Sequence, residues 1–303
     1  MVRREIGQNL MNPSSSIIVF TSFSGIGFGL FFFLGFGLPA PRGMIAFIFM
    51  AMAFTLTLGG LVASTFHLGH PERALKAFTQ WKTSWLSREA WLAIATLFFM
   101  IIYGIGLVFF GVAIGLLGYM GAALSLTTVY STSMIYAQLK TVPRWNTPLT
   151  PALFLIISLT GGSILSGQRE IALILLLATG IIQIIYWIKG DQAFARSGIT
   201  MMSATGLGKG GTISMFEPPH TGTNYLLREF VHVVGRKHSS KLRMVSLLLM
   251  VGIPIALLST PFNFWINIIA SIFHLIGVLV SRWLFFAQAE HAVGVYYGER
   301  ENK

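Results

Sequence analysis

The sequence predicts an all-α integral membrane protein: a bundle of eight transmembrane helices, with both chain ends on the cytoplasmic side. Of 303 residues, 54% are hydrophobic and only 10% are charged, whereas a soluble domain carries roughly 25% charged residues. Apolar segments of about 20 residues, the length that crosses a bilayer, fill most of the chain. The positive charges gather on one side of these segments. Together the three observations predict one transmembrane domain, residues 1–303.

Eight segments have the length and composition of a membrane span. They are 16–38, 44–66, 90–111, 114–139, 149–167, 170–188, 243–260 and 264–288. The first is interpreted as a retained span, because it is too long for a signal-peptide core and no small-residue cleavage site follows it. Gly25 and Gly29 in this span have the four-residue spacing that lets two helices approach closely.

The distribution of basic residues predicts the orientation. Eight spans put both termini on one side, together with the loops 67–89, 140–148 and 189–242. All 21 Lys and Arg residues except Arg42, Arg169 and Arg282 fall on that side. The positive-inside rule therefore places the termini in the cytoplasm. The net charge of +11 is explained by topology, and nucleic acid is not an expected partner.

The loop 189–242 is the only sizeable soluble element. Apolar residues recur at helical spacing from Leu226 to Val234, which suggests an interfacial or partner-facing helix within 217–238. A basic loop lying on the headgroups of anionic membrane lipids explains the same residues, and both interpretations stay open.

Cysteine is absent from the whole sequence. This excludes a disulfide framework, a thiolate metal site and a Cys-ligated iron–sulfur cluster in this chain.

Few ionisable residues fall within or next to the spans, where such groups are costly and usually functional. His67 ends the second span, Glu89 opens the third, and Arg282 lies in the eighth. The directions of these spans place all three at similar depth near the cytoplasmic face. A histidine beside a carboxylate can give and take protons, as the two-electron, two-proton chemistry of a quinone requires.

Other interpretations of these residues stay open. His67 also fits a helix C-terminal cap, where an imidazolium favours the dipole. His70 and its neighbours fit a plain turn, because Pro71 stops the helix. Arg73 fits an interfacial anchor, and Trp85 fits an aromatic belt, with cofactor stacking as the alternative.

His274 lies near the middle of the last span. Two histidines at that depth on facing helices can ligate a b-type haem, but His67 and His291 lie nearer the surface. Packing with a hydrogen-bonded partner is therefore the favoured interpretation of His274. Haem is not expected, and no other metal site is predicted.

Three stretches resemble the dimethyl sulfoxide reductase membrane-anchor family. "HLGHPERALKAFTQWKTSWLSREA" (67–90) is similar to the loop between the second and third helices of that family, with its His-Leu-Gly-x-Pro-x-Arg-Ala opening and Leu-Ser-x-Glu ending. "YAQLKTVPRWNTPLTPALFLIISLTGG" (136–162) and, more loosely, "SRWLFFAQAEHAVG" (281–294) match further regions. The spacing from His67 to Glu89 fits without a gap.

The resemblance implies an eight-helix, quinone-binding anchor in the bacterial inner membrane. Its partners would be a four-cluster, ferredoxin-like iron–sulfur subunit and a molybdopterin catalytic subunit. The family positions that match His67 and Glu89 are associated with quinol oxidation, and the family members in question lack haem b. Arg73 and Arg282 are then expected to orient or polarise the quinone, with His70, Trp85 and His274 as secondary candidates.

Two features favour a cytoplasm-facing enzyme. The long 189–242 loop, with "EPPHTGTNYLLREF", resembles anchors of cytoplasm-facing sulfite dehydrogenases, and the 67–89 loop lies on the positively charged side. The leading expectation is sulfite oxidation by the partners, with electrons passed to ubiquinone or menaquinone. The alternative in the same class is a dimethyl sulfoxide or polysulfide reductase that oxidises quinol. A secondary transporter is the alternative from another class, although the sequence shows no internal repeat.

Overall fold

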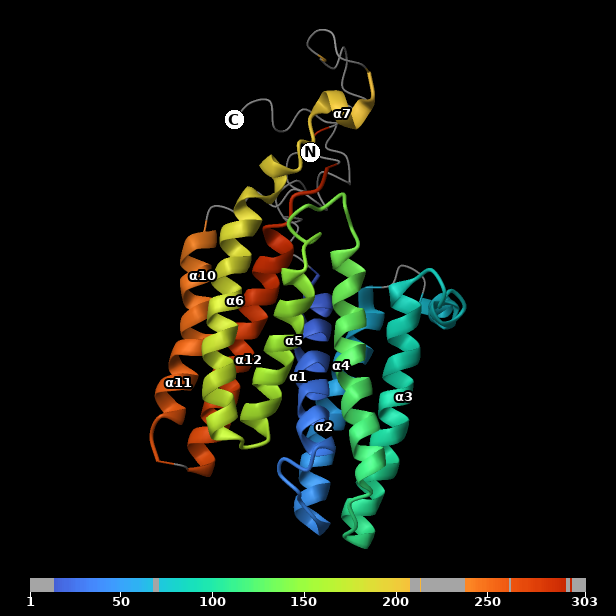
Figure 1. Cartoon of the computed structure of the whole chain (residues 1–303), viewed down its shortest axis with the longest axis vertical. Helices are drawn as coiled ribbons and strands as arrows, with labels where there is room; N and C mark the ends of the chain where they lie inside the picture. The colour runs from blue at the N-terminus through green and yellow to red at the C-terminus, as the bar shows by residue number, and fades with distance from the viewer. Residues whose placement is uncertain are drawn as a thin grey trace, which may run out of the picture.

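The computed structural model describes residues 14–67, 71–207, 213, 238–261, 263–292 and 295, without the side chains of residues 67, 71–73, 201 and 204. Every regular element in this part is helical (Figure 1). The elements are α1 (Ser15–Gly35), α2 (Gly43–Ala63), η1 (Ser64–His67), η2 (Pro71–Phe78), α3 (Trp85–Ile105), η3 (Gly106–Phe110), α4 (Gly115–Ala137), α5 (Leu149–Leu165), α6 (Arg169–Arg196), α7 (Met201–Thr205), α10 (Ser239–Leu247), η4 (Leu248–Gly252), α11 (Ile253–Leu258) and α12 (Phe264–Ala287).

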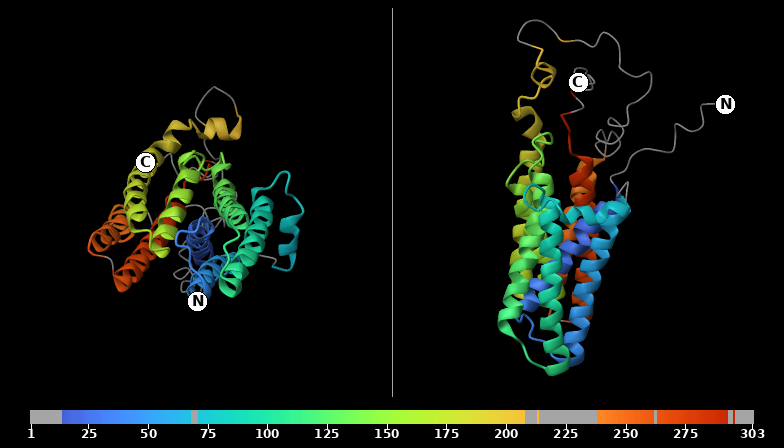
Figure 2. Two further views of the ribbon diagram at one scale, coloured as in Figure 1. Left: turned by 60° about the horizontal axis from the view of Figure 1, so that its bottom comes forward. Right: turned by 90° about the vertical axis from the view of Figure 1, so that its right-hand side faces the viewer.

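The long helices run side by side and alternate in direction (Figures 1 and 2). The connections before α3 and α5, together with α7, lie at one end of the bundle, which we call the loop end. The connections before α2, α4, α6 and α12 lie at the opposite end. Chain neighbours therefore pack as antiparallel pairs, as α1 does with α2 and α3 with α4.

Within the described residues, six helical segments are long and apolar enough to cross a membrane. They are Ser15–Gly35, Gly43–Phe66, Trp85–Phe110, Arg169–Arg196, Ser239–Leu258 and Phe264–Ala287. Helix α5 is apolar but shorter. Helix α4 has several Ser and Thr residues interspersed among its apolar ones, which lower its hydropathy. The all-helical prediction is confirmed in the described part of the chain, while the count of eight crossings stays a prediction.

Two predicted boundaries are wrong. Helix α3 begins at Trp85, five residues before the predicted start, because the Ser84 side chain caps it by accepting from the Ser87 N–H. Glu89 therefore lies in the second turn of α3 and does not open it. Helix α6 continues to Arg196, so the predicted loop 189–242 begins eight residues later. The helix predicted within 217–238 lies outside the described residues.

The extension of α6 follows from its last residues. Gln192, Ala193 and Ala195 are good or acceptable helix formers, and Arg196 places a positive charge in the last turn, where the helix dipole favours it. The helix ends only at Ser197 and Gly198, where Gly198 takes a φ of +65°. A helix can therefore be longer than its membrane-spanning part when its polar end continues into water.

Small residues bring α1 against α5. A Cβ atom on Gly29 would overlap the Ser158 carbonyl, and one on Gly162 would overlap the backbone of Gly29. The Ser158 hydroxyl donates to the Gly25 carbonyl at 2.5 Å. Close approach through small residues is what stabilises helix pairs in lipid. The predicted role in close helix packing is confirmed for Gly29. It is wrong for Gly25, where an added Cβ atom would meet nothing within 4 Å, although the Gly25 carbonyl accepts the Ser158 hydrogen bond.

The helix α10–η4–α11 is interrupted for a reason visible in its sequence. Pro254 has no N–H, so the Met250 carbonyl, four residues earlier, loses its usual helical donor. A π-helical turn, η4, lies at this point, as is common where the regular ladder is broken. The Met250 carbonyl instead accepts a hydrogen bond from His274 on α12.

Candidate functional site

Glu89 is a buried carboxyl held between two helices. It lies on α3 with 4% of its surface exposed, and its Oε1 accepts a hydrogen bond from the Thr132 hydroxyl on α4. The same hydroxyl lies 3.0 Å from the Thr128 carbonyl. A carboxyl at this depth is expensive unless it is hydrogen-bonded, and Thr132 supplies that bond.

The hydrogen bonds around Thr132 suit either protonation state of Glu89. Thr132 has one hydroxyl proton and two acceptors within reach. An ionised Glu89 takes that proton as its hydrogen bond. A protonated Glu89 donates to the Thr132 oxygen instead, and Thr132 then donates to the Thr128 carbonyl. The pair can therefore accompany the gain and loss of a proton without moving a helix.

Arg282 on α12 is buried and incompletely paired. It is 2% exposed, and its guanidinium carbon lies 3.5 Å from the centre of the Phe154 ring, a cation–π contact. Its Nε and Nη1 atoms make no hydrogen bond in the described part of the chain. Buried donors without acceptors cost free energy, so this arrangement calls for a reason beyond packing.

A small cavity lies between Arg282 and Thr132, the hydrogen-bond partner of Glu89. Ser24 and Ser158 also line it, together with apolar side chains such as Phe28 and Ile157. Its volume of about 10 Å³ is enough for about one water molecule. No direct ion pair joins Glu89 and Arg282 within the described residues, so Thr132 and the cavity are the link between them. Thr132 lines this cavity and Glu89 does not, so the contact of Glu89 with the cavity runs through Thr132.

Sequence reasoning missed Thr132 and Tyr136, which complete this site. Tyr136 lies within electrostatic reach of both Glu89 and Arg282, and its ring contacts that of Phe154, with the centres 5.8 Å apart. Thr128, Thr132 and Tyr136 follow at four-residue spacing, which places them along one face of α4. That spacing in "TTVYSTSMIY" was the available signal.

The histidines of the 67–70 stretch are only partly described. The backbone of His67 ends η1, and η1 contacts η2, which packs against α3. These contacts place η1, which ends at His67, at the same end of the bundle as the start of α3, the helix that carries Glu89. The two segments can be followed in Figure 2. The side chains of His67 and Arg73 lie outside the description, and so does His70. Their predicted roles stay predictions.

Neighbouring side chains pack against the Trp85 ring. The Arg88 guanidinium lies over its ring at 4.3 Å, and the Tyr130 ring meets it edge-on at 5.9 Å. Trp81 and Trp91 are both more than half exposed, as the aromatic-belt interpretation expects for residues at a membrane interface. These contacts favour a packing role for Trp85.

The Nδ1 atom of His274 makes a hydrogen bond that helps to pack α12 against its neighbour. Nδ1 lies 2.7 Å from the Met250 carbonyl, and because a carbonyl only accepts, Nδ1 carries a proton. The favoured interpretation, packing with a hydrogen-bonded partner, is supported. His274 also lines an apolar groove of about 930 Å³ towards the opposite end, between α2, α5 and α12. This volume is in the range of ligand sites, but the groove does not include Glu89.

Comparison with known proteins identifies the family. A family model described as DMSO reductase anchor subunit (DmsC) matches residues 11–288. This range includes the first two stretches that carry the family resemblance and the start of the third. The chain is also 29% identical to a sulfite dehydrogenase subunit of Allochromatium vinosum, over 95% of this chain and 99% of that relative. The chain therefore belongs to the DMSO reductase anchor subunit family.

Proposed function

We propose that this chain is the membrane anchor and quinone-binding subunit of a molybdopterin and iron–sulfur oxidoreductase. It would pass electrons between an iron–sulfur partner and the quinone pool of the bacterial inner membrane. Family membership supports the anchor role. The observation that carries the quinone role is Glu89, a buried carboxyl whose single hydroxyl partner suits both of its protonation states.

In this proposal all eight helical segments cross the membrane, and the loop end faces the cytoplasm. The charge distribution of the sequence supports this orientation. The iron–sulfur and molybdopterin subunits would dock on the loop end, next to η1, η2 and the start of α3. Electrons would then reach a quinone close to Glu89.

In the proposed quinone reaction each site residue has a separate role. A quinone that is reduced takes up two electrons and two protons. Glu89 would supply or accept one proton, with Thr132 exchanging its hydrogen bond as Glu89 changes state. His67 would handle the second proton from the end of η1. Arg282 would favour negative charge near Glu89 from across the small cavity, and Arg73 would help to orient the quinone.

We propose sulfite oxidation with quinone reduction as the reaction of the complex. The similarity to a sulfite dehydrogenase subunit supports this direction. The family description instead names DMSO reductase, so an anchor that oxidises quinol for a sulfoxide or polysulfide reductase is the second candidate. A twin-arginine export signal on the catalytic subunit would favour the second. Sulfite-dependent quinone reduction by the purified complex would favour the first.

The Glu89→Gln variant tests the site in the complete complex. Quinone-linked turnover should fall by about 100-fold or more, because general acid–base groups contribute roughly 10²–10⁴ in rate. His67→Ala should act in the same direction. Activity with artificial electron carriers, which draw on the partners directly, should stay at the wild-type level.

Glu170→Gln is a matched control. Glu170 is an exposed carboxylate in the first turn of α6, at the opposite end from Glu89, so its loss should leave quinone-linked turnover unchanged. Wild-type quinone-linked rates in both Glu89→Gln and His67→Ala would rule the proposed site out.

A further inference from the structure

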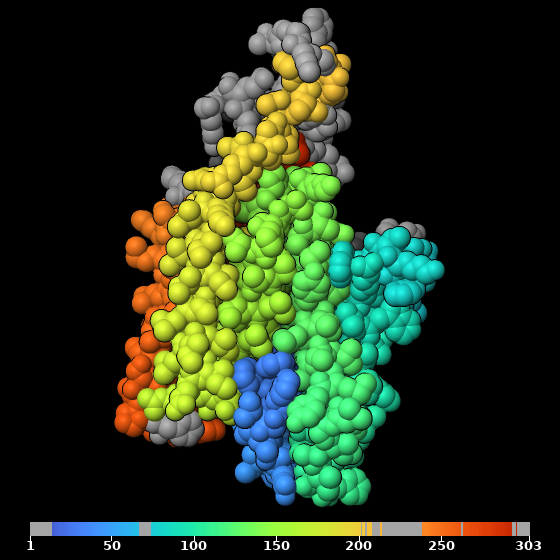
Figure 3. All heavy atoms as spheres, in the orientation of Figure 1, coloured from blue at the N-terminus to red at the C-terminus, as the bar shows by residue number. Residues whose placement is uncertain are grey.

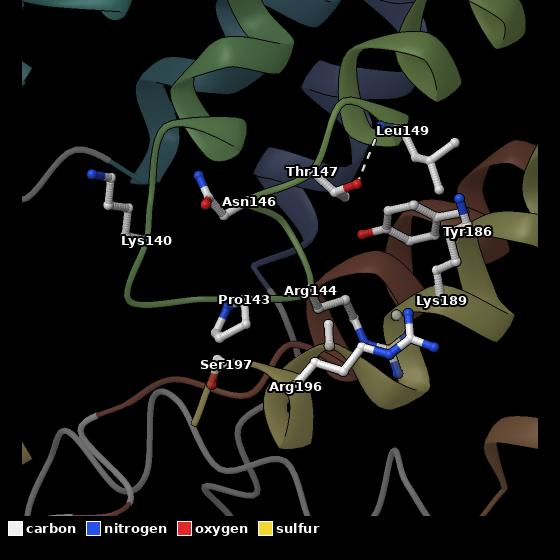
Figure 4. A pocket seen from close by; sticks show the side chains of 12 residues that line it. Lys140, Pro143, Arg144, Asn146, Thr147, Leu149, Tyr186, Lys189, Arg196 and Ser197 are labelled. Carbon is white, nitrogen blue, oxygen red and sulfur yellow. Dashed lines mark hydrogen bonds between the residues drawn. The ribbon is translucent and has the colours of Figure 1, made fainter. Parts of the chain in front are cut away.

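A basic pocket lies at the loop end, between the 138–148 connection and the last turns of α6 (Figure 4). Its volume is about 330 Å³. Four of its lining residues are cationic, namely Lys140, Arg144, Lys189 and Arg196, and none of the lining residues is acidic. A concave site with this charge attracts an anion.

Arg144 forms a fixed wall of this pocket. Its Nη2 atom pairs with Asp191 at 2.5 Å, and its Nη1 atom lies 3.5 Å from the Gln288 side-chain oxygen. Gly190 allows this position, because a Cβ there would approach Arg144 Nη1 to 2.9 Å. Lys189 and Arg196 are exposed at the rim, where they can reach a bound group.

Tyr186 presents a buried donor to the pocket. Its residue is 2% exposed, and its hydroxyl points into the space beside Thr147 in Figure 4. That hydroxyl lies near Thr150, whose own proton goes to the Trp145 carbonyl at 2.7 Å. Apart from its interaction with Thr150, the Tyr186 hydroxyl has no hydrogen-bond partner in the described part of the chain. A phenol among four cations suits an oxyanion, to which it can donate.

The exposed face of α6 next to the pocket indicates which kind of anion the pocket can bind. Helix α6 lies along the outside of the molecule beside α5 (Figure 3). Ile181, Ile185 and Lys189 follow at four-residue spacing, so they stack along one strip of this helix. Ile181 is 60% exposed and Ile185 is 36% exposed. An apolar, exposed strip thus leads directly to the cationic rim.

We propose that this pocket binds the phosphate of an anionic phospholipid, whose acyl chains lie along Ile181 and Ile185 of α6. Tyr186 and the rim cations Lys189 and Arg196 hold the phosphate oxygens, while Arg144 contributes its charge. Basic pockets between helices on the cytoplasmic side suit such headgroups. The inference needs only that α6 crosses the membrane, and it holds whether or not quinone binds near Glu89.

Lipid retention by the purified complex tests the site. The complex is exchanged into detergent with anionic phospholipid, and the retained lipid is quantified by mass spectrometry. Each basic residue near an anionic headgroup contributes roughly a fivefold factor, so the double variant Lys189→Gln/Arg196→Gln should bind about 25-fold more weakly. Tyr186→Phe should weaken binding less, because it removes one donor and no charge.

The double variant Lys76→Gln/Lys82→Gln is the matched control. It removes the same charge from η2 and the segment that follows it, and it should retain lipid as the wild type does. Unchanged retention in Lys189→Gln/Arg196→Gln would overturn the proposal. Equal loss in both double variants would also overturn it, because binding would then depend on total charge and not on this pocket.

Two further arms distinguish the source of the anion. Zwitterionic phospholipid and inorganic phosphate should each fail to displace the anionic lipid, because neither combines the charge with acyl chains on α6. Full displacement by inorganic phosphate would identify a free-phosphate site and contradict the lipid assignment. Loss of the partner subunits from Lys189→Gln/Arg196→Gln, with lipid content unchanged, would assign the pocket to a partner's acidic segment.

Discussion

Arg144 and Arg282, the two buried arginines among the residues that the structure describes, have opposite environments. Arg144 is 8% exposed and pairs with Asp191. The Asp191 carboxylate also accepts hydrogen bonds from both terminal nitrogens of Arg243, at 2.6 and 2.7 Å. Arg282 is 2% exposed and lies against the Phe154 ring and a small cavity, and two of its nitrogens have no hydrogen-bond partner among the described residues. Arg144 shares the Asp191 carboxylate with Arg243, whereas Arg282 has no ion-pair partner in the described part of the chain.

The difference fits a structural role for Arg144 and the functional role proposed for Arg282. Arg144 ties the 138–148 connection to α6 and, through Asp191, to α10. Arg282 keeps a positive charge beside the Glu89–Thr132 pair with donors still available. Uncompensated buried charge destabilises a fold, so it is retained where it serves chemistry.

Arg282→Met should have the largest effect on the proposed reaction. Removing a preorganised positive charge at a reacting site costs about 100-fold in rate or more, so quinone-linked turnover should fall by that factor. Arg282→Lys, which keeps the charge but loses the stacking on Phe154, should retain more activity. Rates are measured with quinone and with artificial carriers on complexes that co-purify all partners. A wild-type quinone rate in Arg282→Met would place Arg282 with Arg144 as a structural residue.

Thr132→Val should reduce quinone-linked turnover by about fivefold, because a net hydrogen bond is worth about 1 kcal/mol. The substitution keeps the shape of the side chain and removes only the hydroxyl that joins Glu89 to the cavity. Thr132→Ser keeps that hydroxyl and should stay close to the wild-type rate. Equal rates in the valine and serine variants would show that the link between Glu89 and Arg282 does not run through Thr132.

Asp191→Asn should act on stability and not on turnover. It removes the carboxylate shared by Arg144 and Arg243, and because Asp191 is partly exposed the expected cost is about 1–2 kcal/mol. The melting temperature of the detergent-solubilised complex should fall, while quinone-linked turnover per assembled complex stays unchanged. Slower turnover at an unchanged melting temperature would reverse the assignment of the two arginines.

His274→Ala should have the smallest effect on turnover. It leaves the Met250 carbonyl without its donor, so stability should fall by about 1–3 kcal/mol with little change in the quinone-linked rate. His274→Asn can place an amide N–H near the same carbonyl and should recover part of that stability. A large loss of turnover in a stably assembled His274→Ala complex would give His274 a functional role like that of Arg282.

The sequence predicted the helices because the bilayer sets a length that apolar composition reveals. It placed the start of α3 too late, since the Ser84 cap lies among polar residues, and it ended α6 too early, where the helix runs on into water. Glu89 and Arg282 were found because charges at membrane depth are conspicuous. Thr132 was missed because threonine is common in apolar helices. Its role appears only when α3 and α4 are placed side by side.

The close packing of α1 bears on the order in which the bundle assembles. Within its most apolar window, 72% of α1 is buried, against 28% for α2 and 39% for α3. Its tight contacts at Gly29 and Gly162 are with α5, more than 100 residues later in the chain. Helix α2, which is made directly after α1, also packs tightly against it at Gly27 and Gly60. The surface that α5 provides does not yet exist when α1 enters the membrane, so lipid or the insertion machinery must cover that face of α1 until α5 arrives.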